Sequence, residues 1–78
     1  MDKMIFDRLA ALILPYTESD VVLTESTKFR TELGISSFTM MCLLGDIEDA
    51  FSVKIRYEDV GKLISLGDAV AYLQEAKP

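Results

Sequence analysis

The chain is short, apolar and acidic. Its 78 residues are 50% hydrophobic, which is enough to build one small domain with its own core, and we assign residues 1–78 to a single domain. The formal net charge of −5 would repel the phosphate backbone of DNA or RNA and attract basic protein surfaces. We therefore expect protein partners and no nucleic-acid partner.

The sequence lacks several features that catalytic sites, metal sites and disulfides need. There is no histidine, which removes the usual general base, the Ser–His and Cys–His pairs and most zinc sites. Cys42 is the single cysteine, so no disulfide can form within the chain. No apolar run reaches the ~18–20 residues of a membrane span, and the N-terminus lacks the apolar centre of a signal peptide. We expect a cytoplasmic, monomeric, non-catalytic protein.

Residues 3–14 are predicted to form the first helix. Ile5, Leu9, Leu12 and Ile13 recur at helical spacing on one face, and Pro15 should end the helix.

Residues 15–34 are predicted to form a long irregular connection. It ends in a short turn, "TELG", at residues 31–34. Its expected core anchors are Val21, Val22, Leu23 and Phe29.

A second helix should begin at Ser36 or Ser37 and run to about Phe51. Five of its residues fall on or beside one apolar stripe and should face the core, namely Met40, Leu43, Leu44, Ile47 and Phe51. The opposite stripe holds Phe38, Cys42, Gly45 and Asp49 and is unusually poor in charge for an outer face. Either the long connection buries this stripe or the stripe binds a partner.

The C-terminal part is predicted to be an extended link followed by two helices. Residues 57–63 can form at most a short third helix, because Gly61 disfavours it. Residues 65–76 form a clearer last helix, in which Ser65 and Asp68 have the spacing of a capping box. The predicted fold is an all-α bundle of three main helices and a short one, with a long loop between the first two.

The two adjacent serines at the start of the second helix have different expected roles. Ser36 can cap the helix by accepting a hydrogen bond from a free backbone N–H group. Ser37 would then lie in the first turn, where unpaired N–H groups and the helix dipole favour an anion. A phosphodiester on Ser37 would be electrostatically favourable there.

Two stretches of the chain, "TELGISSFTMMCLLGDIEDAF" and "KIRYEDVGKLISLGDAVAYL", resemble the acyl carrier protein family. In that family a glycine precedes an Asp-Ser-Leu motif that opens the second helix. Gly34 matches the glycine, Ser37 the serine and Phe38 the leucine.

Two further segments support the resemblance. Residues 47–51, "IEDAF", resemble the acidic end of the family's second helix with its core phenylalanine. Residues 66–73, "LGDAVAYL", resemble the start of its last helix. The resemblance covers nearly the whole chain.

The resemblance implies both a fold and a function. It implies a four-helix bundle in which a phosphopantetheinyl transferase attaches 4′-phosphopantetheine from coenzyme A to Ser37. The thiol of this arm would hold acyl or polyketide intermediates as thioesters, and the carrier itself would catalyse nothing.

The resemblance also implies two groups of further site residues. Partner enzymes with basic or mixed apolar surfaces would dock on residues of the second and third helices, namely Phe38, Met41, Cys42, Gly45, Asp46, Glu48, Asp49, Glu58 and Asp59. A cleft between these two helices would accept the acyl chain and be lined by Met40, Leu44, Val60, Leu63 and Ile64. We expect no metal site.

The sequence departs from the family pattern at the serine motif and just after it. Ser36 replaces the family's aspartate, and Thr39 and Cys42 stand where fatty-acid carriers commonly have acids. We therefore expect a specialised fatty-acid or secondary-metabolite pathway. Two alternatives stay open, an aminoacyl or peptidyl carrier and a helical protein-interaction module without a cofactor.

Overall fold

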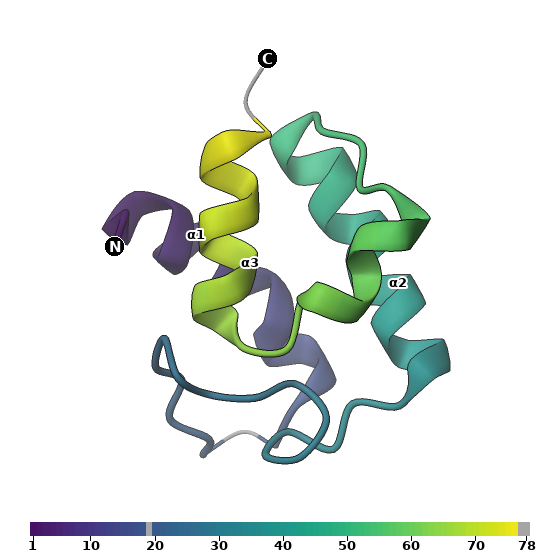
Figure 1. Cartoon of the computed structure of the whole chain (residues 1–78). Coiled ribbons are helices and arrows are strands. Elements are labelled where there is room, and N and C mark those ends of the chain that lie inside the picture. Colours follow the sequence, from purple (N-terminus) through teal and green to yellow (C-terminus); the bar gives the residue numbers. More distant parts are fainter. Residues whose placement is uncertain (19, 77–78) are drawn as a thin grey trace.

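The fold is all-α, as predicted from the sequence. The computed structural model describes residues 1–18 and 20–76, and Figure 1 shows their arrangement. Within these residues, three α-helices and two 3-10 helices follow one another as α1 (Lys3–Ile13), η1 (Leu14–Tyr16), α2 (Ser37–Phe51), η2 (Tyr57–Lys62) and α3 (Leu66–Glu75). No β-strand occurs in these residues, and an isolated bridge joins Lys28 to Ser65.

Helix α1 has the predicted position and apolar face. The side chain of Asp2 caps it by accepting a hydrogen bond from the N–H of Ile5 at 3.1 Å. Leu9 and Ile13 are completely buried. Helix α1 ends at Ile13, just before Pro15, as predicted, and a 3-10 helix, η1, follows directly, with Pro15 near its start, where a missing N–H is tolerated.

Helix α2 also has its predicted bounds. It begins after Ser36, and it ends at Ser52, whose backbone adopts the left-handed conformation with φ of 55° and donates its N–H to the carbonyl of Glu48. Leu43, Leu44 and Ile47 are buried. The predicted core stripe is therefore confirmed at the centre of the helix.

The last two helical elements, η2 and α3, differ in regularity. Residues Tyr57–Lys62 form a 3-10 helix, η2, and not a full α-helix. Helix α3 begins with the predicted capping box, in which Ser65 accepts from the N–H of Asp68 and the Asp68 carboxylate accepts from the N–H of Ser65.

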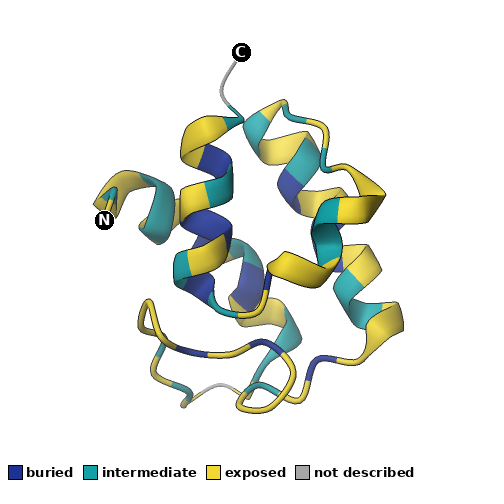
Figure 2. Cartoon of the chain, viewed as in Figure 1, coloured by how far each residue is buried: buried dark blue, intermediate teal, exposed yellow. Residues whose placement is uncertain are grey.

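The core lies where the three α-helices meet the connecting loop. Helix α1 packs against both α3 and α2, and Figure 2 shows buried residues on each α-helix and at points along the loop. The buried apolar residues come from all these parts, namely Leu9, Ile13, Phe29, Ile35, Leu43, Leu44, Ile47, Leu63, Leu66, Ala69, Val70 and Leu73.

The connecting loop is held firmly at the end that precedes α2. The N–H of Phe29 donates to the carbonyl of Ile64 and the N–H of Ile35 to that of Phe29, both at 3.0 Å. Phe29 is buried, as predicted, but Val22 is 79% exposed, so its prediction as a core anchor was wrong. Gly34 adopts φ of +66°, a conformation that glycine allows and that turns the chain towards α2.

Candidate functional site

The junction between the loop and α2 places Ser36 and Ser37 in different environments. Ser36 is the N-cap, and its Oγ accepts a hydrogen bond from the N–H of Thr39 at 3.2 Å. Ser37 is the first residue of the helix, and its side chain is exposed. One hydroxyl therefore stabilises the helix start while its neighbour remains open to solvent.

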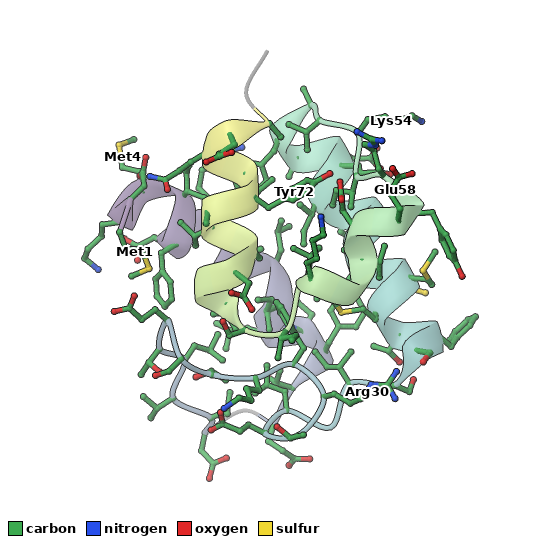
Figure 3. The ribbon with its side chains drawn as sticks, in the orientation of Figure 1. Met1, Met4, Arg30, Lys54, Glu58 and Tyr72 are labelled. Atoms are coloured by element: carbon green, nitrogen blue, oxygen red, sulfur yellow. The ribbon has the colours of Figure 1, made fainter. Side chains whose placement is uncertain are left out.

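The hydroxyl of Ser37 has a cationic neighbour that sequence reasoning missed. Nη2 of Arg30 donates a hydrogen bond to Oγ of Ser37. Figure 3 shows Arg30 reaching from the loop to the start of α2. No periodic pattern in the sequence marks Arg30, because the contact depends on how the loop turns back at Gly34.

Backbone donors also surround this position. Within the part of the chain that the structure describes, the N–H groups of Ser37 and Phe38 have no acceptor, since the cap takes the N–H of Thr39. These N–H groups and the Arg30 guanidinium form a positive environment around a nucleophilic oxygen. The residues therefore fit a phosphodiester on Ser37.

The outer face of α2 is open and largely apolar. Phe38 is 78% exposed and Met41 53% exposed, and Cys42 and Gly45 are exposed as well. The loop does not cover this face, so the alternative in which the loop buries Phe38 and Cys42 is wrong. We call these four residues the outer face of α2.

Most of the carboxylates predicted to dock partners have contacts within the molecule. Asp46 accepts from the Tyr16 hydroxyl, Glu48 from the N–H of Ile55 at 2.6 Å, and Glu58 pairs with Arg56. The first two contacts join α2 to η1 and to the link before η2, and the third lies at the start of η2.

Asp49 and Asp59 differ in their surroundings. Asp49 is exposed, and in residues 1–18 and 20–76 its carboxylate makes no hydrogen bond or ion pair. Asp59 is half-buried and accepts from the Tyr72 hydroxyl at 2.8 Å and from Nζ of Lys62 at 3.3 Å. Asp49 is therefore the more available of the two for a partner.

The hydrogen bonds from Tyr16 to Asp46 and from Tyr72 to Asp59 shift the pKa values of side chains that take part in them. The hydrogen bond from Tyr72 lowers the pKa of Asp59 below its ordinary value, and Lys62 and Arg56 act in the same direction. The same hydrogen bond raises the pKa of Tyr72, and the hydrogen bond to Asp46 raises the pKa of Tyr16. The largest cause of each shift is a hydrogen bond between two different helical elements, and Ser37 is not among the causes.

A pocket of about 320 Å³ lies beside the loop, α2 and η2. Four of the residues predicted to line an acyl cleft lie on its wall, namely Met40, Val60, Leu63 and Ile64. Apart from Gly61 of η2, the loop supplies the rest of the wall, including Phe29, Ile35 and Arg30, which the sequence prediction did not include. Leu44 lines a separate pocket of about 170 Å³ with Met41 and Tyr57.

A larger hollow lies elsewhere on the molecule. Its volume is about 740 Å³, and it is an open depression beside η2 and α3 lined by Lys54, Arg56, Lys62 and Tyr72 among others. Its walls do not include Ser37 or Arg30. Ser37 is not on the wall of the 320 Å³ pocket either, but Arg30, which contacts Ser37, is part of that wall.

No helix in the described residues is long and apolar enough to cross a membrane.

Comparison with known proteins identifies the family. The family described as "Phosphopantetheine attachment site" matches residues 7–73. An acyl carrier protein from Kineococcus radiotolerans is 42% identical over 59 residues, which cover 76% of this chain and 72% of the relative. An acyl carrier protein from an Exiguobacterium species is 38% identical over 52 residues, which cover 67% of this chain and 66% of that relative.

A solved structure has the same fold. MacpD, an acyl carrier protein from Pseudomonas fluorescens involved in mupirocin biosynthesis, aligns with a TM-score of 0.74 over 97% of this chain and 74% of its own, at 20% identity. The family match spans most of the chain, and the first relative is 42% identical over about three quarters of it. The chain therefore belongs to the acyl carrier protein family, whose members carry covalently attached 4′-phosphopantetheine.

Proposed function

We propose that this protein, as one domain over residues 1–78, is a non-catalytic carrier that bears 4′-phosphopantetheine on Ser37. The observation that supports this most strongly is the exposed Ser37 hydroxyl in the first turn of α2, surrounded by donors from Arg30 and the free N–H groups. Ser36 is the less suitable acceptor because its oxygen already caps the helix. When bound, the arm supplies a thiol that holds an acyl group as a thioester.

The loading step needs a separate transferase and coenzyme A. Oγ of Ser37 forms a bond to the phosphorus that carries pantetheine, and the bond from this phosphorus to adenosine 3′,5′-bisphosphate breaks. The hydroxyl proton passes to a base of the transferase, since this chain has no histidine to accept it. The chain's own contribution is to present the oxygen at a fixed, open position.

We propose that partner enzymes dock on the outer face of α2. An exposed aromatic residue beside Met41 is typical of the centre of a protein–protein contact. Asp49, at the far end of the helix, could meet a basic group of the partner. A partner for this face would need an apolar patch near the serine and only limited positive charge.

We also propose that the pathway is a specialised one. The replacement of the family's aspartate by Ser36 and the apolar outer face support a dedicated set of partners. The structural neighbour MacpD is itself involved in mupirocin biosynthesis.

The pocket beside α2 and η2 is the proposed place for part of the cargo. Met40, Leu63 and Ile64 supply flexible and apolar walls that suit a hydrocarbon chain. Arg30 is part of this wall and also contacts Ser37, which supports a pocket close to the proposed attachment residue.

Intact-mass spectrometry tests the proposed function. The protein is incubated with coenzyme A, magnesium and a phosphopantetheinyl transferase of broad specificity, beside the Ser37→Ala and Ser36→Ala variants. We expect a mass gain of one phosphopantetheine in the wild type and in Ser36→Ala, and none in Ser37→Ala. A wild type that gains no mass with any transferase tested would favour the cofactor-free interaction module instead.

A further inference from the structure

Arg30 lies on a part of the loop that is fixed on both sides. The flanking residues Phe29 and Ile35 are each 3% exposed. The carbonyl of Arg30 accepts a hydrogen bond from the N–H of Gly34 at 3.1 Å, which closes the turn. The backbone of Arg30 is therefore fixed near Ser37, and its exposed side chain reaches Oγ of Ser37 through its own hydrogen bond.

The charge of Arg30 is unusual in its surroundings. The ion pairs within residues 1–18 and 20–76 use Lys3, Arg56 and Lys62. Over the same residues, Arg30 makes no ion pair, and its side chain donates to the neutral hydroxyl of Ser37. In an acidic chain, this leaves a positive charge without a carboxylate partner at the oxygen that the proposed function modifies.

The carboxylates near this position do not neutralise Arg30. Glu32, two residues along the loop, accepts from the backbone N–H of Lys28 at 3.0 Å. Position 36, where the family has an aspartate, is a serine here. The departure at residue 36 and the unpaired arginine therefore have the same electrostatic effect, because both make the site more positive.

We propose that Arg30 is the counter-ion of the phosphodiester formed on Ser37, an inference that rests on the proposed function. A phosphodiester has two non-bridging oxygens that share one negative charge. The planar guanidinium can donate two parallel N–H groups to them, and such charge-assisted hydrogen bonds are about twice as strong as neutral ones. The existing contact to Oγ places the guanidinium within reach of these oxygens.

The proposed ion pair would also restrict the arm near its attachment point. Because Arg30 is part of the wall of the 320 Å³ pocket, the paired phosphodiester would lie at the edge of that pocket. Arg30 would thus act as an anchoring residue for the arm, while the thiol at the other end keeps its freedom.

Nuclear magnetic resonance of the side-chain Nε–H groups of arginine tests the inference on the wild-type chain. Spectra are compared before and after loading, with Arg8 and Arg56 as internal references, because they contact Ala50 and Glu58 and not Ser37. We expect the Arg30 resonance to move and its exchange with water to slow, while the two references stay in place. An Arg30 resonance that is unchanged in fully loaded protein would overturn the inference.

Phosphorus resonance of the loaded protein gives a second readout with a matched control. Arg30→Gln removes the guanidinium, and Lys28→Gln removes one positive charge from the same loop and the same pocket wall without touching Ser37. Circular dichroism checks that both variants are folded. We expect Arg30→Gln to move the phosphorus resonance and Lys28→Gln to leave it unchanged, and salt of about 1 M to move the wild-type signal towards that of Arg30→Gln.

The results separate the two proposals. Equal phosphorus shifts in Arg30→Gln and Lys28→Gln would contradict a specific role of Arg30 and leave the carrier function intact. Failure of the wild type to gain the mass of phosphopantetheine would contradict both.

Discussion

The two adjacent serines at the start of α2 make different contacts. The Ser36 oxygen is engaged by the N–H of Thr39, and the Ser37 oxygen faces solvent and Arg30. The sequence predicted both positions, because a cap must precede the first helical turn. It did not predict Arg30, whose approach to Ser37 depends on the buried neighbours Phe29 and Ile35.

Substitution of each serine should affect a different property. Ser36→Ala removes the cap and should lower the free energy of unfolding by about 1 kcal/mol, while loading of Ser37 persists. Ser37→Ala should change stability much less and should abolish loading. Urea unfolding and intact-mass spectrometry of both variants measure these effects. A Ser36→Ala protein as stable as the wild type would contradict the capping role.

At the scale of the helical elements, the sequence predicted the regular helices well and the irregular segments poorly. The apolar stripe of α2 and the capping box of α3 were both predicted correctly, because each depends on residues close together in the sequence. Val22 was placed wrongly, since hydrophobicity alone does not tell which residues of an irregular loop turn inward. The 3-10 form of η2 was not predicted either, because a short pattern fits both helix types.

The outer face of α2 should determine recognition by the enzyme that loads the acyl group. The double variant Phe38→Ala, Cys42→Ser removes an exposed aromatic ring and a thiol from this face without touching the core. We expect KM for the carrier to rise roughly tenfold, the change that ~1.4 kcal/mol of lost contact energy produces. Steady-state acylation kinetics with the cognate enzyme measure this.

Met4→Ala is the matched control for this prediction. Met4 is 77% exposed but lies on α1, away from the serine motif. The Met4→Ala variant should leave the KM for the carrier unchanged. If the double variant is acylated as well as the wild type, the outer face of α2 is not the docking surface.

Over the whole molecule, a few polar contacts join elements that are distant in the sequence. Nη2 of Arg8 on α1 donates to the carbonyl of Ala50 on α2 at 2.7 Å, and its guanidinium lies 4.3 Å from the centre of the Phe51 ring. Tyr72 on α3 donates to Asp59 on η2 at 2.8 Å. Sequence patterns predicted the helices that these contacts join but not the contacts, because side-chain pairing depends on the final packing.

The contact between Tyr72 and Asp59 should make stability depend on pH. The pKa of Asp59 is lowered in the folded protein, so its stabilising contribution is complete above the pKa of the unfolded chain. This contribution is lost as the pH falls through the lower pKa of the folded state. Tyr72→Phe removes the main cause of the shift and should therefore make the protein less sensitive to acid.

Urea unfolding of the wild type and Tyr72→Phe between about pH 7 and pH 2 tests this dependence. We expect the wild type to be the more stable at pH 7 and the difference to shrink below about pH 4. A difference that stays constant over this range would show that the hydrogen bond does not lower the pKa of Asp59.

The identity of the modified residue is the central claim, and tandem mass spectrometry of the loaded protein tests it most directly. Trypsin cleaves after Arg30 and Lys54 and releases the peptide 31–54, which contains Ser36, Ser37 and Thr39. We predict that C-terminal fragment ions beginning at Ser37 carry the mass of phosphopantetheine and that those beginning at Phe38 do not. If the mass appears only in ions that include Ser36, or is already present in ions beginning at Phe38, Ser37 is not the attachment site.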